Sequence, residues 1–356
     1  MRWLLVGRGR EGVEGAQLEG FDMYAGALRA ELGLEVVRQD AATLAEARAA
    51  IAAHADVDAA LVMPSWAEPA ERLIAWCREA RALGPRLVLL DYYAQTSSPH
   101  LGAAPHVDLY VKRQALRDRG LYRRELASGY VFTEFLARDL GWDLAGWRFG
   151  SVLPAGHEGA LVVGWSLGVL RRNRLLARLG AAPWALRPLD VNARVGGEEA
   201  DGPQEWYQRY RALARERLQA LAGRLRVSHS GRVTRRRYLA ELLRSRVVVS
   251  PFGWGEVCFR DYEAVACGCL LVKPSMRHVE TRPDVFVDHE TYLPLRWDLA
   301  DLEEVVRRAL EEPRRARRIA ENGRRRLRDY FERGGFVADV ARVADALAGR
   351  RRALAA

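Results

Sequence analysis

A glycine-rich turn and the helix after it, within Ser250–Pro274, carry the residue types best suited to hold a phosphate-bearing ligand. The turn follows a buried strand candidate, Arg246–Ser250, so its backbone N–H groups and the next helix N-terminus would form an anion pocket. On that helix, Glu263 lies three residues after Arg260, beside the buried stripe. A carboxylate there can accept two hydrogen bonds from vicinal hydroxyls. The pattern predicts a site for the ribose and phosphates of a nucleotide.

A second interpretation of the same residues is structural. Arg260 and Glu263 would form a surface ion pair, and Glu256 would stabilise the helix through its charge near the N-terminus. The nucleotide interpretation adds residues at the carboxyl ends of neighbouring strand candidates, where ligands of open α/β sheets bind. These residues are Gly253, Trp254, Gly255 and Glu256 in the turn, Ser230, Gly231 and Arg232 after the strand candidate Arg224–Ser228, Arg194 in VNARVGG, and Lys273.

Lysine is rare in this chain: of 56 basic residues only Lys112 and Lys273 are lysines, and the other 54 are arginines. A GC-rich genome accounts for most of this bias, so a retained lysine would mark a position that needs a compact ammonium group. Both lysines follow strand candidates at their carboxyl ends. We therefore predict that Lys273 contacts a phosphate, and that Lys112 lies at a cleft edge.

A first glycine cluster, Gly7–Gly12 (GRGREG), follows the first strand candidate and has the formal spacing of a dinucleotide-binding turn, with Asp40 ending the second strand. That motif needs a helix that opens at the third glycine. The segment Val13–Gly20 holds two more glycines and no apolar stripe, so we expect the helix no earlier than about Gly20, after a long glycine loop. The bulky charged residues of the turn also argue against a dinucleotide.

Short apolar runs that alternate with amphipathic stretches must position these residues. In the first third, strands are predicted at Arg2–Val6, Leu34–Arg38, Ala59–Met63, Arg86–Leu90 and Val107–Val111, and helices at Phe21–Leu32, Thr43–Ala53 and Glu68–Leu83. After about Trp184, strands are predicted at Leu186–Val191, Arg224–Ser228, Arg246–Ser250, Leu270–Val272 and Val285–Val287, and helices at Glu205–Leu221, Arg235–Arg244 and Val257–Cys267. This alternation indicates parallel βαβ units.

The fold class is therefore α/β with two domains and a helical, arginine-rich tail over Leu302–Leu347. We assign residues 1–150 to the first domain, with a connection to about 184. Residues 185–345 form the second domain, and 346–356 form a basic tail. The segment Gly141–Gly168 has no clean period and is interpreted as helices and a connection.

The run from Ser228 to Pro274 resembles the donor-binding half of GT-B glycosyltransferases, in particular the family 1-like bacterial group that includes spore-coat glycosyltransferases. The pattern Glu-Ala-x-x-x-Gly before a buried strand, which starts at Glu263, is the shared core of that donor site. The resemblance covers most of residues 185–345, and the first half agrees in layout only. It implies two Rossmann-like domains that face each other, the first binding mostly the acceptor and the second mostly the nucleotide-sugar donor. Glu263 would then bind the donor ribose, and Phe252–Gly255 would lie near the donor phosphates.

The sequence departs from that group at one point. Many retaining members have two glutamates with seven residues between them, whereas Glu256 and Glu263 enclose six. Glu256 therefore cannot be assigned the first position, and a retaining or inverting outcome stays open.

The resemblance implies transfer of a sugar from a nucleoside diphosphate sugar to a glycan, lipid-linked or other acceptor, with no metal ion or other cofactor. Cations and helix dipoles would then neutralise the departing diphosphate. His229 would hydrogen-bond a phosphate or the sugar, and Glu11 and Asp91 are candidate general bases for the acceptor hydroxyl. Asp91 could equally form an acceptor platform with Tyr92 and Tyr93.

Three alternatives remain: a sugar-nucleotide epimerase on the same architecture, a nucleotide-sugar binder without activity, and a nucleic-acid-binding protein. The last follows from the net charge of +10 on 356 residues, which favours polyanionic partners such as nucleic acid, phosphorylated ligands or an anionic membrane face. The arginine clusters of the tail lack the interleaved aromatic residues that stack on bases, so we expect no nucleic acid.

Four cysteines lack the spacing of a metal site or a disulfide scaffold. The N-terminus has no signal-peptide pattern, and no apolar run approaches the roughly 18 residues of a membrane span. We therefore expect a cytoplasmic enzyme that makes peripheral contact with the inner face of an anionic membrane.

Overall fold

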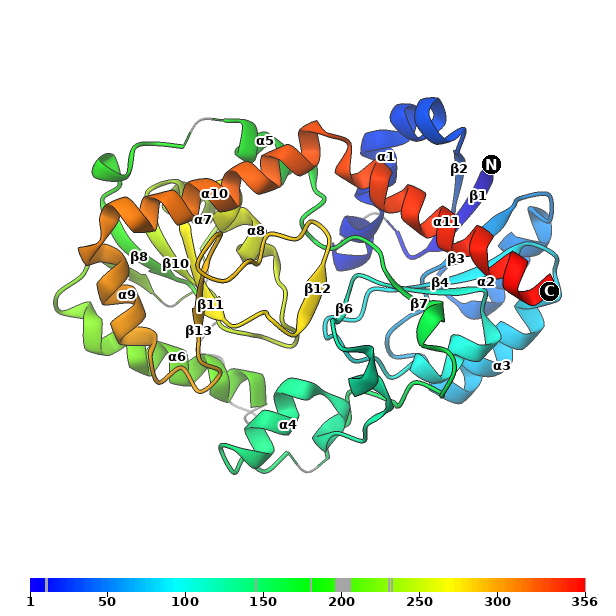
Figure 1. Ribbon diagram of the computed structural model, residues 1–356, viewed down its shortest axis with the longest axis horizontal. Coiled ribbons are helices and arrows are strands. Elements are labelled where there is room, and N and C mark those ends of the chain that lie inside the picture. The colour runs from blue at the N-terminus through cyan, green and yellow to red at the C-terminus, as the bar shows by residue number, and fades with distance from the viewer. Residues whose placement is uncertain are drawn as a thin grey trace. The chain divides into compact units, whose positions relative to one another are not determined.

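The computed structural model describes residues 1–9, 12–144, 146–179, 181–195, 206–229, 231 and 233–355. The chain forms two compact units (Figure 1). Unit 1 consists of Met1–Leu170, Val279–Pro283 and Gly334–Ala356, and unit 2 consists of Arg171–His278 and Asp284–Arg333.

Unit 1 is built on a six-stranded sheet in which all neighbouring strands are parallel. In spatial order the strands are β2 (Glu35–Asp40), β1 (Arg2–Gly7), β3 (Ala59–Val62), β4 (Arg86–Asp91), β5 (Leu109–Lys112) and β7 (Leu161–Val163). The central strands are continuous buried runs, as expected for a sheet covered on both faces. A separate antiparallel pair joins β6 (Gln114–Leu116) to β12 (Val279–Thr281).

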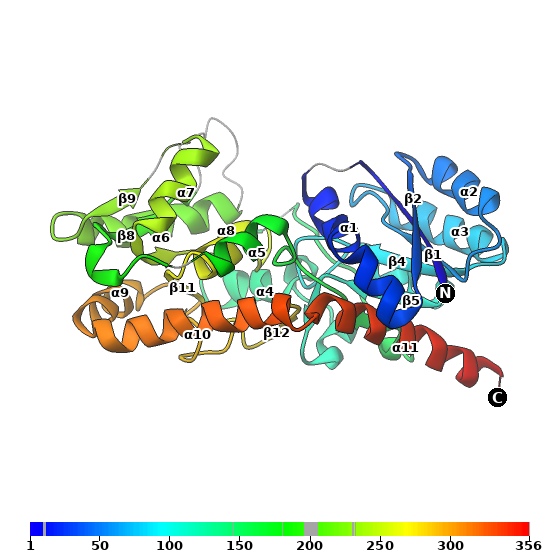
Figure 2. The same cartoon turned by 90° about the horizontal axis from the view of Figure 1, so that it is seen from above.

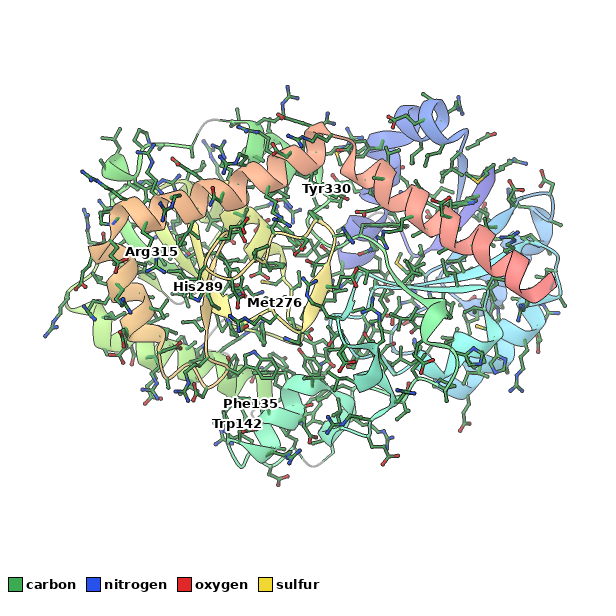
Figure 3. The ribbon with its side chains drawn as sticks, viewed as in Figure 1. Phe135, Trp142, Met276, His289, Arg315 and Tyr330 are labelled. Atoms are coloured by element: carbon green, nitrogen blue, oxygen red, sulfur yellow. The ribbon has the colours of Figure 1, made fainter. Side chains whose placement is uncertain are left out.

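Helices cover both faces of this sheet (Figure 2). Helices α1 (Gly12–Leu32) and α11 (Gly335–Ala355) pack on each other, and α2 (Leu44–Ala53) packs on α3 (Ala70–Arg81). Between β4 and β7 the chain forms α4 (Val131–Arg138) and the 3-10 turns η1 (Leu101–His106), η2 (Arg119–Arg123), η3 (Ala127–Gly129) and η4 (Glu158–Ala160). Phe135 lies within α4, and Trp142 follows the helix, with its backbone N–H donating to the carbonyl of Leu136 at 3.0 Å (Figure 3).

Helix α1 begins at Gly12, so the prediction of a long glycine loop up to about Gly20 is wrong. The glycine at position 20 serves packing, because a Cβ added there would lie 2.4 Å from the Phe336 ring of α11. The buried apolar residues of α1 run from Ala16 and Leu18 to Leu28. A close helix contact therefore explains Gly20, one of the two glycines that suggested a loop.

The last helix belongs to unit 1. Phe336 packs against Phe21, Tyr24 and Trp165 with ring centroids 5.3–5.6 Å apart. Arg342 donates a hydrogen bond to the carbonyl of Val163 in β7 at 2.6 Å. The sequence pattern predicts a second domain up to residue 345 and a tail over 346–356, whereas α11 runs through both ranges. Unit 1 also extends beyond residue 150, because the three-residue β7, too short for a period, completes its sheet.

Unit 2 has a five-stranded parallel sheet. In spatial order its strands are β13 (Leu293–Leu295), β11 (Leu270–Pro274), β10 (Ser245–Val249), β8 (Leu189–Ala193) and β9 (Val227–His229). Its helices are α5 (Arg171–Arg178), α6 (Trp206–Ala222), α7 (Arg235–Leu243), α8 (Phe259–Ala266), α9 (Leu302–Glu311) and α10 (Pro313–Glu332), with a 3-10 turn η5 (Trp184–Leu186). Helices α5, α8 and α10 pack on one another, and α6 packs on α9. The strand predicted at Val285–Val287 does not form; β13 takes the edge position instead.

The two sheets share a strand order. Numbered within each unit, the first five strands of both sheets run 2-1-3-4-5, which is a doubly wound Rossmann-like arrangement. The fold class expected from the sequence is therefore confirmed, with the helices of the C-terminal third present. Sheets of this kind bind ligands outside the carboxyl ends of the strands, at the point where the strand order reverses. In unit 2 that point lies between β8 and β10.

Candidate functional site

Two helix N-termini meet the carboxyl edge of the unit 2 sheet beside this point. Helix α7 follows β9 and α8 follows β10, so both start at that edge and direct the positive ends of their dipoles there. The hydroxyl of Thr234 caps α7 by accepting a hydrogen bond from the Arg237 N–H. Helix α8 has a reciprocal cap between Cys258 and Asp261. The edge is therefore suited to an anionic ligand.

Glu263 lies one turn into α8 and is almost completely buried, with 3% of its surface exposed. Arg172 Nε lies 2.9 Å from its Oε1 atom, and Arg235 Nη2 lies 3.4 Å from the same oxygen. The Tyr238 hydroxyl also forms a hydrogen bond with Glu263. Burial is the main cause that raises the pKa of Tyr238 well above its usual value, and the charge of Glu263 adds to it. Two cations and a neutral hydroxyl thus orient a single buried carboxylate.

Sequence reasoning missed Arg172 and Arg235. Arg172 lies in the first turn of α5, and its guanidinium carbon is 4.8 Å from the centre of the Phe259 ring. Arg235 is the first residue of α7. Each follows or precedes other arginines in sequence, and this pattern recurs throughout the chain. Only the packing of α5 against α8 separates Arg172 from the solvated arginines.

Arg260 bridges the two strands that flank the switch point. Its Nε donates to the Ser250 hydroxyl at 3.1 Å, after β10, and its Nη1 donates to the carbonyl of Arg194, after β8. Within the described part of the chain it makes no ion pair with Glu263, so the surface pair considered as an alternative does not form. Arg260 therefore has its guanidinium at the crevice predicted for the ligand.

Arg194, expected to contact phosphate, is held by Glu241. Its guanidinium pairs with both carboxylate oxygens of Glu241, and its Nη1 donates to the carbonyl of Gly231 at 3.0 Å. Ser228 and Arg237 also donate to Glu241, at 2.9 and 3.1 Å. This network joins the ends of β8 and β9 to α7, so we interpret Arg194 as a positioning residue.

Glu241 gives this network a predictable pH dependence. Hydrogen bonds from Arg194, opposed by burial, lower the pKa of Glu241 from 4.5 to about 2. Because the pKa in the folded state lies below that of the unfolded chain, the stabilisation is complete above about pH 4.5 and is lost as the pH falls towards 2. In urea denaturation, Glu241→Gln should be less stable than the native protein at pH 6, and this difference should shrink steadily below pH 4.5. A difference that stays constant down to pH 3 would contradict the prediction.

The glycine-rich turn packs against α6. A Cβ on Gly253 would lie 2.4 Å from the Arg211 guanidinium, and the Gly253 N–H donates to the carbonyl of Gly255 at 3.2 Å. The Trp254 ring lies 6.3 Å from Trp206 and 5.7 Å from Tyr207, both measured between centroids. The turn is thus flanked by aromatic rings and an arginine from one helix.

Glu256 is buried at the end of the same turn, and its Oε1 lies 3.6 Å from His278 Nε2. The His278 ring stands at 72° to the Trp297 ring with centroids 4.8 Å apart. Glu256 lies three residues before the start of α8, so its burial is compatible with the helix-dipole interaction of the structural alternative. It lies beside the candidate site, facing the histidine.

Lys273, the preferred phosphate contact in the sequence analysis, has a structural place instead. It is fully buried, and its Nζ donates to Asp261 Oδ2 and to the carbonyl of Glu256, both at 2.7 Å. The rings of Phe286 and Phe252 lie 4.8 and 5.5 Å from the ammonium. These two acceptors use two of the three N–H donors, and the ammonium is shielded from solvent, so Lys273 is a structural residue and not a phosphate contact.

Lys112 and Asp91 repeat this arrangement in unit 1. Asp91 Oδ2 accepts from Lys112 Nζ at 2.9 Å and from the Tyr110 hydroxyl at 2.7 Å, and both ionised side chains are buried. Burial opposes ionisation, but Lys112 and further hydrogen bonds hold the pKa of Asp91 below its usual value. A buried carboxylate with these partners is a structural group, so Asp91 is not the general base. Tyr92 and Tyr93 are buried too and present no exposed platform for a sugar.

The remaining candidates are incompletely described. Glu11, Ser230 and Arg232 lie outside the described residues, and so does the side chain of His229, whose backbone ends β9. Gly231 has a left-handed backbone with φ of 80°, which glycine adopts without strain. These residues stay predictions.

The first glycine cluster does not fit a dinucleotide, but for a different reason than its spacing. Helix α1 does open at Gly12, so the spacing objection to a dinucleotide no longer holds. The side chain of Arg8, however, donates to the carbonyl of Ala42 at 2.9 and 3.0 Å, across the ends of β1 and β2. The cavity around these residues holds only about 20 Å³, against roughly 300–1,000 Å³ for small-molecule sites. Because the Arg8 side chain occupies this crevice, the space that remains is too small for a dinucleotide.

The described ranges contain no group of three or more His, Cys, Asp or Glu side chains placed to hold a metal ion. None of the helices in the same ranges is long and apolar enough to cross a membrane.

Comparisons with known proteins agree with this geometry. Residues 171–333, which include the whole of unit 2, match the glycosyl transferase-like family model. No protein of curated function matches the sequence. The sucrose-phosphate synthase of Thermosynechococcus elongatus is 15% identical with a TM-score of 0.52, over 98% of this chain and 99% of that one. A glycosyltransferase of Rickettsia africae is 11% identical with a TM-score of 0.52, over 97% and 98% of the two chains.

At these identities the structural likenesses show the fold, and the family model adds the activity. Two Rossmann-like units of matching strand order form the GT-B architecture. The family match covers the unit whose sheet edge gathers Glu263, two arginines and two helix N-termini. The protein is a glycosyltransferase of the GT-B fold.

Proposed function

We propose that the protein transfers a sugar from a nucleoside diphosphate sugar to a glycan or lipid-linked acceptor. The observation that carries this proposal is the buried Glu263 carboxylate, oriented by Arg172 and Arg235 beside the N-termini of α7 and α8. The carboxylate would accept hydrogen bonds from the two ribose hydroxyls, and the arginines and helix ends would bind the diphosphate.

In the transfer, the bond between the anomeric carbon and the diphosphate oxygen breaks, and a bond from an acceptor oxygen to that carbon forms. The acceptor hydroxyl loses its proton to a base, and the diphosphate leaves with the bonding electrons. The negative charge that develops on the diphosphate is stabilised by Arg172, Arg235 and the helix dipoles, in place of a metal ion. Glu11 and His229 remain proposed catalytic residues on their sequence positions alone.

The experiment incubates the purified protein with UDP-, GDP-, ADP- and dTDP-linked sugars, each with and without methyl glycosides and polyprenyl-phosphate sugars as acceptors. We expect one donor to release its nucleoside diphosphate together with a glycosylated acceptor, unchanged by EDTA. Conversion to an epimeric nucleotide sugar without acceptor would instead establish the epimerase alternative. Absence of any conversion, with binding intact, would favour a binding protein without activity.

A surface on unit 2 supports peripheral contact with an anionic membrane. Leu175, Leu179 and Leu186 are 58, 54 and 74% exposed within a short stretch at α5 and η5, and the exposed Arg178 lies among them. Leucines of this kind partition into the headgroup region, and each arginine adds about 1 kcal/mol on an anionic leaflet. We propose that this α5 surface, defined by these four residues, binds the bilayer that carries a lipid-linked acceptor.

Vesicle sedimentation tests the α5 surface. The native protein should sediment with vesicles of phosphatidylglycerol and phosphatidylcholine, and weakly with phosphatidylcholine alone. Leu175→Glu combined with Leu179→Glu should lower the bound fraction at least fivefold. Leu243→Glu, on an exposed leucine of α7, is the matched control and should bind normally. Equal sedimentation of the native protein with both vesicles would refute the surface.

The narrower resemblance to spore-coat glycosyltransferases rests on the run from Ser228 to Pro274 alone. We propose it as a subgroup assignment, since the family match over unit 2 is broader. An acceptor found among spore-coat glycans in the experiment above would support it.

A further inference from the structure

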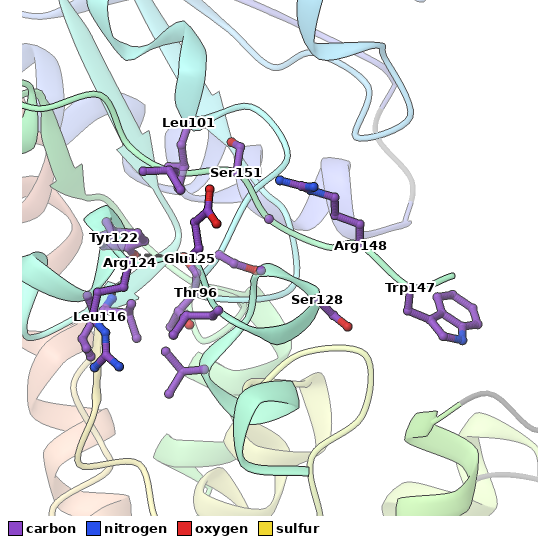
Figure 4. Close-up of a pocket in the computed structure, with 17 residues that line it drawn as sticks. Thr96, Leu101, Leu116, Tyr122, Arg124, Glu125, Ser128, Trp147, Arg148 and Ser151 are labelled. Carbon is purple, nitrogen blue, oxygen red and sulfur yellow. Dashed lines mark hydrogen bonds between the residues drawn. The ribbon is translucent and has the colours of Figure 1, made fainter. Parts of the chain in front are cut away.

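One cavity of unit 1 has no part in the function proposed so far. It holds about 260 Å³ and lies among segments that follow β4 and β5 (Figure 4). Its lining comes from the stretch after β4, from β6, from the turns η2 and η3, and from residues 147–152. The volume is just below the roughly 300–1,000 Å³ of typical small-molecule sites, which suits one small ring and not a nucleotide.

The wall of this cavity contains a left-handed serine and a close contact between two glycines. Ser128 adopts a left-handed conformation with φ of 59°, a strained state for a residue with a side chain. Next to it, Gly129 touches Gly150 so closely that a Cβ on either residue would lie within 2.5 Å of the other's backbone. The Ser128 carbonyl accepts from the Phe149 N–H at 2.7 Å and joins the two wall segments. Strain of this kind is concentrated at binding sites.

Polar groups of saccharide-binding type line the cavity. In Figure 4 the carboxylate of Glu125 points toward Ser151 and Leu101, while Trp147 stands at the edge. Thr96, Ser97 and Ser128 add hydroxyls to the lining. Glu125 is an exposed residue at the mouth of the cavity and has neither a hydrogen bond nor an ion pair to any residue in the described ranges, so its oxygens are accessible to solvent and to a ligand. Sugar hydroxyls are the natural donors to such a carboxylate.

Trp147 supplies the apolar half of the recognition. Its ring stacks on Phe149 with centroids 5.6 Å apart and an angle of 20°, and Phe149 is itself buried. The indole is therefore held in place before any ligand arrives, which lowers the entropic cost of binding. The apolar face of a pyranose can pack against such a ring.

We propose that this cavity binds one pyranose ring of a saccharide, with Glu125 and the serine hydroxyls on its hydroxyl groups and Trp147 against its apolar face. The inference rests on the proposed function insofar as the saccharide is the acceptor of the reaction. A non-reacting sugar of the same glycan has the same chemistry and is the other source.

Saturation-transfer NMR with methyl glucoside, methyl galactoside and methyl N-acetylglucosaminide tests the cavity. The native protein should bind at least one of these probes. Glu125→Gln and Trp147→Ala should weaken that binding at least tenfold, whereas Trp147→Phe should retain most of it. Glu31→Gln, on the exposed surface of α1, is the matched control and should bind as the native protein does. Circular dichroism checks that each variant is folded.

The outcomes separate this inference from the proposed function. If native protein binds a nucleoside diphosphate but none of the glycosides, or if Glu125→Gln and Trp147→Ala bind them normally, the cavity assignment is overturned and the proposed function stands. If the bound glycoside is glycosylated when donor is added, it is the acceptor; if it binds unmodified, the cavity anchors a non-reacting sugar. If no nucleotide binds, the proposed function is contradicted. Glycoside binding would still test the cavity assignment independently.

Discussion

Glu263→Gln should weaken the binding of the cognate nucleoside diphosphate about 10- to 100-fold and reduce sugar transfer at least as much. Hydrogen bonds to a charged acceptor contribute roughly 1.5–3 kcal/mol each, and a neutral amide loses that strength. The fold should survive, because Arg172 and Arg235 are 30 and 59% exposed in their side chains and can be hydrated when the carboxylate is gone. Isothermal titration calorimetry measures the effect.

A comparison with the 2′,3′-dideoxynucleoside diphosphate isolates the ribose contact. The native protein should prefer the ribose form by tenfold or more, and Glu263→Gln should bind both forms alike. The control is Glu303→Gln in the first turn of α9. If the variant kept the full preference for the ribose, Glu263 would not be the residue that holds it.

Lys273→Met should lower the free energy of unfolding by about 3–5 kcal/mol, the cost of leaving one buried charge without its partner. Asp261 would keep only the Ser250 hydroxyl and the Cys258 N–H as donors. Lys273→Arg should rescue little, because a planar guanidinium does not fit where a compact ammonium reaches two oxygens between aromatic rings. Urea denaturation followed by fluorescence gives the values.

Arg277→Met is the matched control, since Arg277 forms a surface pair with Asp288 and its side chain is 77% exposed. Such a pair contributes about 0–1 kcal/mol, so this variant should stay close to the native protein. The double variant Lys273→Met, Asp261→Asn should recover part of the lost stability, as both charges are then removed. A Lys273→Met protein as stable as Arg277→Met would show that the buried pair contributes little.

Local patterns predicted the sheets well. Continuous apolar strands such as β4 and β10, separated by amphipathic helices, indicate a parallel α/β fold without tertiary information. The start of α1 could not be predicted, because Gly20 is a glycine that makes room for Phe336 near the far end of the chain, and not a residue of a loop. The same contact assigns α11 to unit 1. Both differences come from packing between segments remote in sequence.

In the candidate site, too, some residues follow from local sequence patterns and others depend on packing between distant segments. Glu263 could be placed on its helix because strand, turn, helix and strand are consecutive in Ser250–Pro274. Lys273 ends its strand as expected, but a strand end does not reveal whether the side chain faces ligand or core. Asp261 is held locally by the cap of α8, but its pairing with Lys273 depends on how the helix packs on β11. Arg172 joins the site through the packing of α5 on α8, for which one sequence offers no signal.

The central claim is that unit 2 holds a nucleoside diphosphate by a carboxylate, arginines and helix ends. The most direct measurement is calorimetric titration of the purified native protein, in EDTA, with UDP, GDP, ADP, CDP and dTDP. We predict saturable binding of at least one of them at a single site, with an affinity that falls as salt rises because the contacts to the diphosphate are ionic. Absence of binding for all five, in a protein shown to be folded, would contradict the account.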